Sequence, residues 1–190
     1  MNDGVKRNKI VETIVEELDR TLAGIPSQAM ERLVSEIVGA HRIFVSGAGR
    51  SGLMMKAFAM RLMHMGITAY VLGETVTPGI EAPDLLVIGS GSGETDSLVA
   101  AAQKAKRIGS GVALLTINPD STLAGLADTV TTIPAPSPKL DTPDQPRSVQ
   151  PMGSLFEQSL LLTLDAVVIS LMDVRGTDTT KMFRRHANLE

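Results

Sequence analysis

The chain has 190 residues, of which 43% are apolar and 21% charged, a balance typical of a globular protein with one domain over 1–190. Its net charge is −3, and no block of like charge is long enough to predict nucleic-acid binding. The chain has no cysteine, which excludes disulfides and thiolate chemistry.

The first 40 residues predict two helices that precede the main body of the domain. Apolar residues recur at helical spacing from Ile10 to Leu22. A second apolar face follows Ser27, which is predicted to cap that helix. We therefore expect a helical N-terminal extension over 1–40, and an α/β core with C-terminal helices over 41–190.

Five short runs rich in branched apolar residues come next, and helical stretches separate most of them. The runs are 42–46, 67–72, 85–89, 112–117 and 129–133. Strands that alternate with helices predict parallel βαβ units, although the link between the second and third runs is the weakest helix prediction. The third and fourth runs are almost wholly apolar, as strands buried on both faces are. The expected fold is α/β: a five-stranded parallel doubly wound sheet of flavodoxin-like order 2-1-3-4-5.

The last part of the chain predicts a loop, a long helix near 153–175 and a tail helix near 178–186. The loop, 134–151, holds six of the ten prolines, and a loop of this length is usually functional or disordered. The apolar stretch 155–172 is interrupted by polar residues, so a buried helix is favoured over a membrane span. Because residues 1–9 also lack the apolar core of a signal peptide, we expect a cytoplasmic protein without membrane contact.

Two glycine-rich turns, Gly47–Gly52 and Gly89–Thr95, follow the first and third predicted strands, and each opens a helix. Glycines let the backbone come close to a ligand, and free N–H groups at a helix N-terminus bind anions such as phosphate. In a sheet of this order both turns line the crevice where ligands bind. The second turn adds three hydroxyl groups, which favours a phosphate site over simple helix capping.

One alternative for the first turn remains open. Its spacing also matches the weak dinucleotide fingerprint G-x-G-x-x-G, and Glu74 stands where that fingerprint has its acidic residue. Nucleoside triphosphate binding is disfavoured because no lysine of the phosphate-binding-loop type follows the second turn.

Glu157 is the candidate general base. It stands in the first turn of the long apolar helix, where a partly desolvated carboxylate suits proton abstraction. The stretch Ser154–Glu157 equally matches a capping box, in which the glutamate bonds back to the cap residue. The residues alone leave these two roles open.

The three histidines do not form a metal cluster, so no metal or cofactor is expected. His41 reads as a solvated loop residue and His64 as a core or interface residue. His186 reads as an exposed tail residue.

The two glycine-rich turns resemble those of the sugar isomerase (SIS) domain family. Further stretches resemble its 6-phospho-3-hexuloisomerase branch, namely 57–66, 116–119, 150–158 and 186–190. The resemblance implies that 3-hexulose 6-phosphate and fructose 6-phosphate are interconverted through a cis-enediolate, in the ribulose monophosphate pathway of formaldehyde fixation. It also implies a homotetramer, and 3-hexulose-6-phosphate synthase as the pathway partner.

The resemblance also assigns roles to residues. Glu157 corresponds to the general base, and His186 is a candidate catalytic residue supplied by a neighbouring subunit. The implied substrate-binding residues are Gly49, Arg50, Ser51, Ser90, Gly91, Ser92 and Thr95. The phosphate-binding hydroxyls among them are those of the second turn.

Two other functions compete with this one. The first is that of another SIS isomerase, such as arabinose 5-phosphate isomerase. Many of those enzymes carry C-terminal regulatory domains, for which this chain is too short. A non-catalytic sugar-phosphate sensor usually adds a helix-turn-helix domain, and the 40 residues before the first strand are too few and too weakly basic for one. Only an enzyme needs the carboxylate of Glu157.

Overall fold

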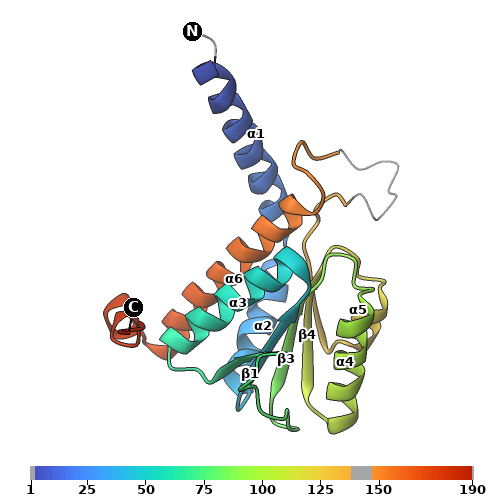
Figure 1. Ribbon diagram of the computed structural model, residues 1–190, viewed down its shortest axis with the longest axis vertical. Coiled ribbons are helices and arrows are strands. Elements are labelled where there is room, and N and C mark those ends of the chain that lie inside the picture. The colour runs from blue at the N-terminus through green and yellow to red at the C-terminus, as the bar shows by residue number, and fades with distance from the viewer. Residues whose placement is uncertain (1–2, 138–146, 190) are drawn as a thin grey trace.

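The computed structural model describes residues 3–137 and 147–189. Its centre is a five-stranded parallel sheet in the order β2-β1-β3-β4-β5, which confirms the predicted fold (Figure 1). The strands are β1 (Ile43–Gly47), β2 (Ala69–Val71), β3 (Leu85–Gly89), β4 (Gly111–Thr116) and β5 (Thr129–Thr132). As predicted from their apolar sequences, β3 is buried throughout and β4 is buried after its first residue.

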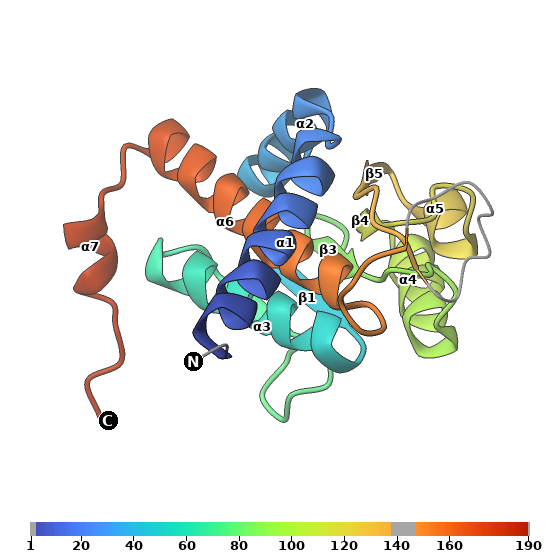
Figure 2. The ribbon, with the colours of Figure 1, turned by 90° about the horizontal axis from the view of Figure 1, so that it is seen from above.

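Helices cover both faces of the sheet. The helices of the described chain are α1 (Asp3–Ala23), α2 (Ser27–Gly39), α3 (Gly49–His64), α4 (Asp96–Ile108), α5 (Thr122–Leu126), α6 (Ser154–Arg175) and α7 (Thr179–Phe183). Helices α2, α3 and α6 pack together on one face, and α4 and α5 pack on the other (Figure 2). Helix α1 packs against α6, and its N-terminal half projects away from the sheet (Figure 1).

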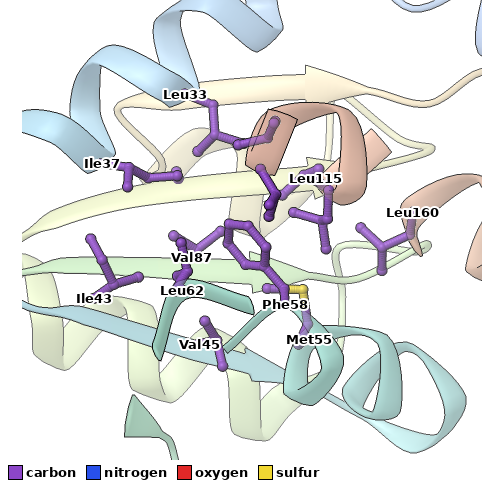
Figure 3. Packing of buried hydrophobic residues seen from close by; sticks show 14 of the residues in the cluster. Leu33, Ile37, Ile43, Val45, Met55, Phe58, Leu62, Val87, Leu115 and Leu160 are labelled. Carbon is purple, nitrogen blue, oxygen red and sulfur yellow. The ribbon is translucent and has the colours of Figure 1, made fainter. Parts of the chain in front are cut away.

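The larger of two hydrophobic cores lies between the sheet and helices α2, α3 and α6. Figure 3 shows Leu33, Phe58 and Leu160 from the three helices gathered over Val45 and Val87 of the central strands. These side chains are at most 2% exposed, and burying each one stabilises the fold by about 1.5–3 kcal/mol. This core fixes where α3 and α6 begin, which matters because both helices start at the candidate site.

Among the described residues, one helix, α6, is long and apolar enough to cross a membrane by length and composition alone. Half of its most apolar stretch is buried inside the protein, against α1, α2 and α3. The packing supports the prediction of a buried core helix.

Three local predictions need correction. Ser27 does not cap α2: Pro26 takes the cap position with an extended backbone, no side chain caps the helix, and Ser27 is its first residue. The segment between β2 and β3 contains no helix, because glycines and prolines interrupt it from Gly73 to Pro83. The tail helix is shorter than predicted, since α7 ends at Phe183. Of the predicted loop 134–151, residues 138–146 lie outside the described residues.

Candidate active site

The two glycine-rich turns start side by side. Strands β1 and β3 are neighbours, and their last residues, Gly47 and Gly89, are partners in the register. The chain then passes to α3 on one face of the sheet and to α4 on the other. This divergence is the topological switch point at which α/β sheets bind ligands, as the sequence predicted.

A cavity of about 400 Å³ opens at this point, within the usual range for a small-molecule site. The predicted substrate-binding residues and the predicted base all line it. They are Gly49, Arg50, Ser51, Ser90, Gly91, Ser92, Thr95 and Glu157. The structure thus brings together residues that lie up to 108 positions apart in the chain.

Three helices begin at the cavity wall. Gly49 is the first residue of α3, Thr95 is the cap residue of α4 and Ser154 is the first residue of α6, and all three residues line the cavity. The first N–H groups of a helix have no partner within it and carry partial positive charge. Their convergence makes the cavity suited to an anionic ligand.

Two glycines have geometric reasons to be glycine. A Cβ atom on Gly52 would lie 2.6 Å from the carbonyl oxygen of Gly47, so any side chain there would push α3 away from β1. Gly93 has φ = +69°, and a Cβ atom on it would lie 2.0 Å from Oγ of Ser121. Glycine at both positions lets the backbone of the turns pack closely against its neighbours.

The three hydroxyl groups of the second turn differ in what they bond. Ser90 Oγ accepts a hydrogen bond from the N–H of Gly93 (3.2 Å), and Ser92 Oγ accepts one from the N–H of Glu94 (3.3 Å). Thr95 stands at the cap position of α4, but its side chain makes no capping hydrogen bond. Helix capping therefore does not account for Thr95, whose hydroxyl group remains available at the cavity.

Glu157 pairs with Arg50 across the cavity wall. Its Oε2 lies 3.0 Å from Nη1 of Arg50, and its side chain is 16% exposed whereas that of Arg50 is 54% exposed. Nη1 donates its hydrogen bond to Ser154 Oγ at 2.7 Å, and no described residue donates a hydrogen bond to Glu157 Oε2. The carboxylate is thus held beside a cation while one oxygen is left able to accept a proton.

The capping box predicted for Ser154–Glu157 is not formed. Gly153 is the cap residue of α6, and Ser154 is already helical. The Ser154 hydroxyl accepts from Arg50, and no side chain caps the helix. Of the two roles that the sequence left open for Glu157, the geometry excludes helix capping and leaves that of general base.

Sequence reasoning missed several residues of the cavity wall. Ser137, Met152 and Phe156 line it, as does Ile117 after β4. Met152 has φ = 55°, the one positive φ at a non-glycine residue in the described chain, which costs about 1–3 kcal/mol. Its neighbours Pro151 and Gly153 could have suggested a tight turn, but no sequence signal shows that this turn faces the cavity.

His186 lies at the other end of the protein. It stacks on His64, with ring centroids 5.3 Å apart, and on Phe183. His64 is the last residue of α3, so the length of that helix, roughly 24 Å, separates it from the cavity. His64 is buried, as predicted; burial lowers its pKa, and the nearby Arg61 and His186 lower it further. A catalytic role for His186 thus stays a prediction that requires another subunit.

No group of three or more histidine, cysteine or acidic side chains that could hold a metal ion occurs in the part of the chain that the structure describes. Glu74, the residue that kept a dinucleotide site open, forms an ion pair with Lys56 of α3 at 2.8 Å. In this sheet β3 lies beside β1. In a dinucleotide-binding sheet the third strand lies beyond the second one instead.

The sheet order and the paired glycine-rich turns define a doubly wound α/β domain with a cavity suited to an anionic ligand at its switch point. The model of the SIS domain family matches residues 36–167, and the chain belongs to this family. Two relatives that match over nearly the full length are named isomerases, and the chain is a sugar-phosphate isomerase of this family.

The resemblance to the 6-phospho-3-hexuloisomerases is confirmed. The chain is 49% identical to the 3-hexulose-6-phosphate isomerase of Bacillus subtilis, over 98% of this chain and 100% of the relative. It is 44% identical to the enzyme of that name from Mycobacterium gastri, over 100% of this chain and 94% of the relative. A solved structure from Methanococcus jannaschii, for which the same molecular function has been inferred, is 30% identical with a TM-score of 0.84 and covers 96% of this chain and 99% of that chain.

Proposed function

We propose that the chain interconverts 3-hexulose 6-phosphate and fructose 6-phosphate by proton transfer through a cis-enediolate. The observation that carries the proposal is the Glu157 carboxylate, mostly shielded from solvent and paired with Arg50 through Oε2, in a cavity at which three helices begin. A base and an anion site in one cavity are the two parts that a sugar-phosphate isomerase needs.

The substrate phosphate binds at the turn Ser90–Thr95. The start of α4 supplies partial positive charge, and the Thr95 hydroxyl supplies a hydrogen-bond donor that no capping role occupies. Ser90 and Ser92 shape the turn by accepting hydrogen bonds from its backbone, and their hydroxyl hydrogens can still point to a phosphate oxygen. Fixing this remote group positions the reacting carbons against the base.

Glu157 removes the proton from C2 of 3-hexulose 6-phosphate and returns it to C3. The electron pair of the C2–H bond forms the C2–C3 double bond, and the C3 carbonyl becomes an enediolate oxygen. The hydroxyl proton on O2 then moves to O3, and collapse of the enediolate from O2, with the proton delivered to C3, places the carbonyl at C2 and a hydroxyl group at C3. One carboxylate can perform both transfers if it lies over one face of the two carbons.

Arg50 stabilises the enediolate. Its described contacts both use Nη1, and a guanidinium has five N–H donors, so other donors can reach substrate oxygens. A fixed cation beside developing negative charge lowers the barrier. Gly49, Ser51 and Gly91 add backbone close to the substrate.

We further propose that the enzyme is a cytoplasmic homotetramer that acts after 3-hexulose-6-phosphate synthase. Three large apolar side chains of α3 support an oligomer: Leu53, Met60 and Met63 are between 41% and 57% exposed. His186 of a neighbouring subunit completes the cavity in this proposal. A monomeric mass by light scattering at micromolar concentration would contradict the oligomer.

The experiment that tests the function supplies the purified protein with enzymatically made 3-hexulose 6-phosphate and measures fructose 6-phosphate. Arabinose 5-phosphate serves as the control substrate. Turnover of the hexulose without turnover of the pentose supports the proposal. Turnover of arabinose 5-phosphate alone would assign the chain to a different sugar-phosphate isomerase, and binding without turnover of either would make it a sensor.

A further inference from the structure

A second carboxylate, that of Glu17, is buried outside the cavity and has no part in the proposed chemistry. It comes from α1 and is 5% exposed. Its Oε2 accepts hydrogen bonds from Ser148 Oγ at 2.7 Å and Gln150 Nε2 at 3.0 Å, and its Oε1 accepts from the N–H of Val149 at 2.8 Å. One side chain of the N-terminal extension thus holds three consecutive residues more than 130 positions away.

The segment that Glu17 holds leads directly into the cavity wall. Residues 151–154 follow it, and all of them line the cavity. The Gln150 side chain continues the contact, because its Oε1 accepts a hydrogen bond from Gln158 Nε2 at 2.6 Å. Gln158 is the neighbour of Glu157 in the first turns of α6. The hydrogen bonds therefore run from Glu17 to both sides of the proposed base.

The same wall contains the strained residue Met152. Its positive φ is unfavourable for a side chain, and it is 81% exposed, so packing of its own side chain does not hold it. Strained backbone persists only where the surroundings determine it. The hydrogen bonds of Glu17 fix the chain up to Gln150, two residues before Met152. The N–H of Ser154, which donates to the Pro151 carbonyl at 3.1 Å, closes the turn around Met152.

Glu17 is charged when it makes these contacts. Burial by itself raises the pKa of Glu17, but the hydrogen bonds from Gln150, Ser148 and the Val149 N–H, together with Arg20, outweigh burial and hold the pKa below its ordinary value. A charged acceptor makes stronger hydrogen bonds than a neutral one. All three partners are donors, so a carboxylate satisfies them together, whereas a glutamine amide offers only one acceptor oxygen.

We propose that Glu17 is a positioning residue for the isomerase reaction: it holds residues 148–153 and the start of α6 so that Glu157 faces the substrate. The inference rests on the proposed function. It gives the N-terminal extension a part in turnover, although that extension contributes no residue to the cavity.

The test compares Glu17→Ala and Glu17→Gln with Glu12→Ala, a control that removes an exposed carboxylate from the same helix. For Glu17→Ala we expect kcat to fall about 10²-fold, the loss typical of a misplaced catalytic group. The constant for inhibition by inorganic phosphate should not change, because the Ser90–Thr95 turn is untouched. Glu17→Gln should recover part of kcat, and Glu12→Ala should match the parent.

Three results would overturn the proposal. The first is a parent kcat in Glu17→Ala. The second is parallel loss of phosphate binding and turnover, which indicates general unfolding rather than misplacement. The third is an equal kcat in the alanine and glutamine variants, which removes the role of the acceptor oxygens. Failure of the proposed function is separate: the parent protein itself would then not convert 3-hexulose 6-phosphate, and this inference would fall with it.

Discussion

Thr95→Val separates phosphate binding from the stability of the second turn. The substitution keeps the shape of the side chain and removes its hydroxyl. Because this hydroxyl makes no capping hydrogen bond to α4, the variant should unfold at nearly the parent urea concentration. Binding should suffer instead, since a hydrogen bond to a charged group contributes about 1.5–3 kcal/mol.

The lower end of that range applies, because helix N-termini and two further hydroxyls share the phosphate. A loss of about 1.5 kcal/mol corresponds to a roughly tenfold weaker inhibition by inorganic phosphate. For Ser90→Ala we expect a loss of folding stability instead. Its buried oxygen accepts from the Gly93 N–H, so removing it leaves that group unpaired and costs about 1–3 kcal/mol of folding stability.

The assay is inhibition of turnover by inorganic phosphate, with urea denaturation of each variant. Thr180→Val, at an exposed position on α7, is the matched control and should behave as the parent. If Thr95→Val binds phosphate as tightly as the parent, the assignment of the phosphate to this turn is wrong.

Three further variants test other parts of the structure. Gly93→Ala should lower the free energy of unfolding in urea by about 1–3 kcal/mol and bind phosphate poorly, because φ is positive and the added Cβ would overlap Ser121. A free energy of unfolding equal to that of the parent would contradict this. Burial raises the pKa of Asp84, but hydrogen bonds from Arg42 and the nearby backbone outweigh it, so the folded pKa is depressed. Its contribution to stability should therefore be complete above its ordinary pKa of about 3.9 and lost as pH falls through the lower folded value. The stability advantage of the parent over Asp84→Asn in urea should shrink between pH 7 and pH 3, and an advantage independent of pH would refute the assignment. Deleting residues 186–190 should abolish turnover in both directions while phosphate still binds; intact turnover would make the tail structural.

The sequence predicted the architecture well because its signals were local. Apolar runs such as 85–89 are bounded by turn residues, and both glycine-rich turns lie at strand ends. The two helix-cap predictions were wrong because another residue, adjacent in the chain or in space, occupies the predicted position or hydrogen bond. Pro26 took the cap position expected for Ser27, and Arg50 took the Ser154 hydroxyl that a capping box would have used.

The sequence predicted only the part of the cavity wall that the two glycine-rich turns form. Glu157 stood out as a carboxylate in an apolar helix, but its pairing with Arg50 joins residues 107 positions apart. The hydrogen bonds of Glu17 to residues 148–150 are equally non-local. In the sequence, Glu17 is one acidic residue among several on a polar helix, and nothing there marks it as buried.

The most direct test of the account is proton exchange by Glu157→Gln. The variant keeps the size of the side chain and leaves the Ser90–Thr95 turn untouched, so phosphate should bind as in the parent. Turnover should fall by about 10²–10⁴-fold, the loss expected for a positioned base. In deuterated water, exchange at C2 of 3-hexulose 6-phosphate, and at C3 of fructose 6-phosphate in the reverse direction, should stop along with turnover. A Glu157→Gln protein that exchanges these protons at the parent rate would show that another group is the base.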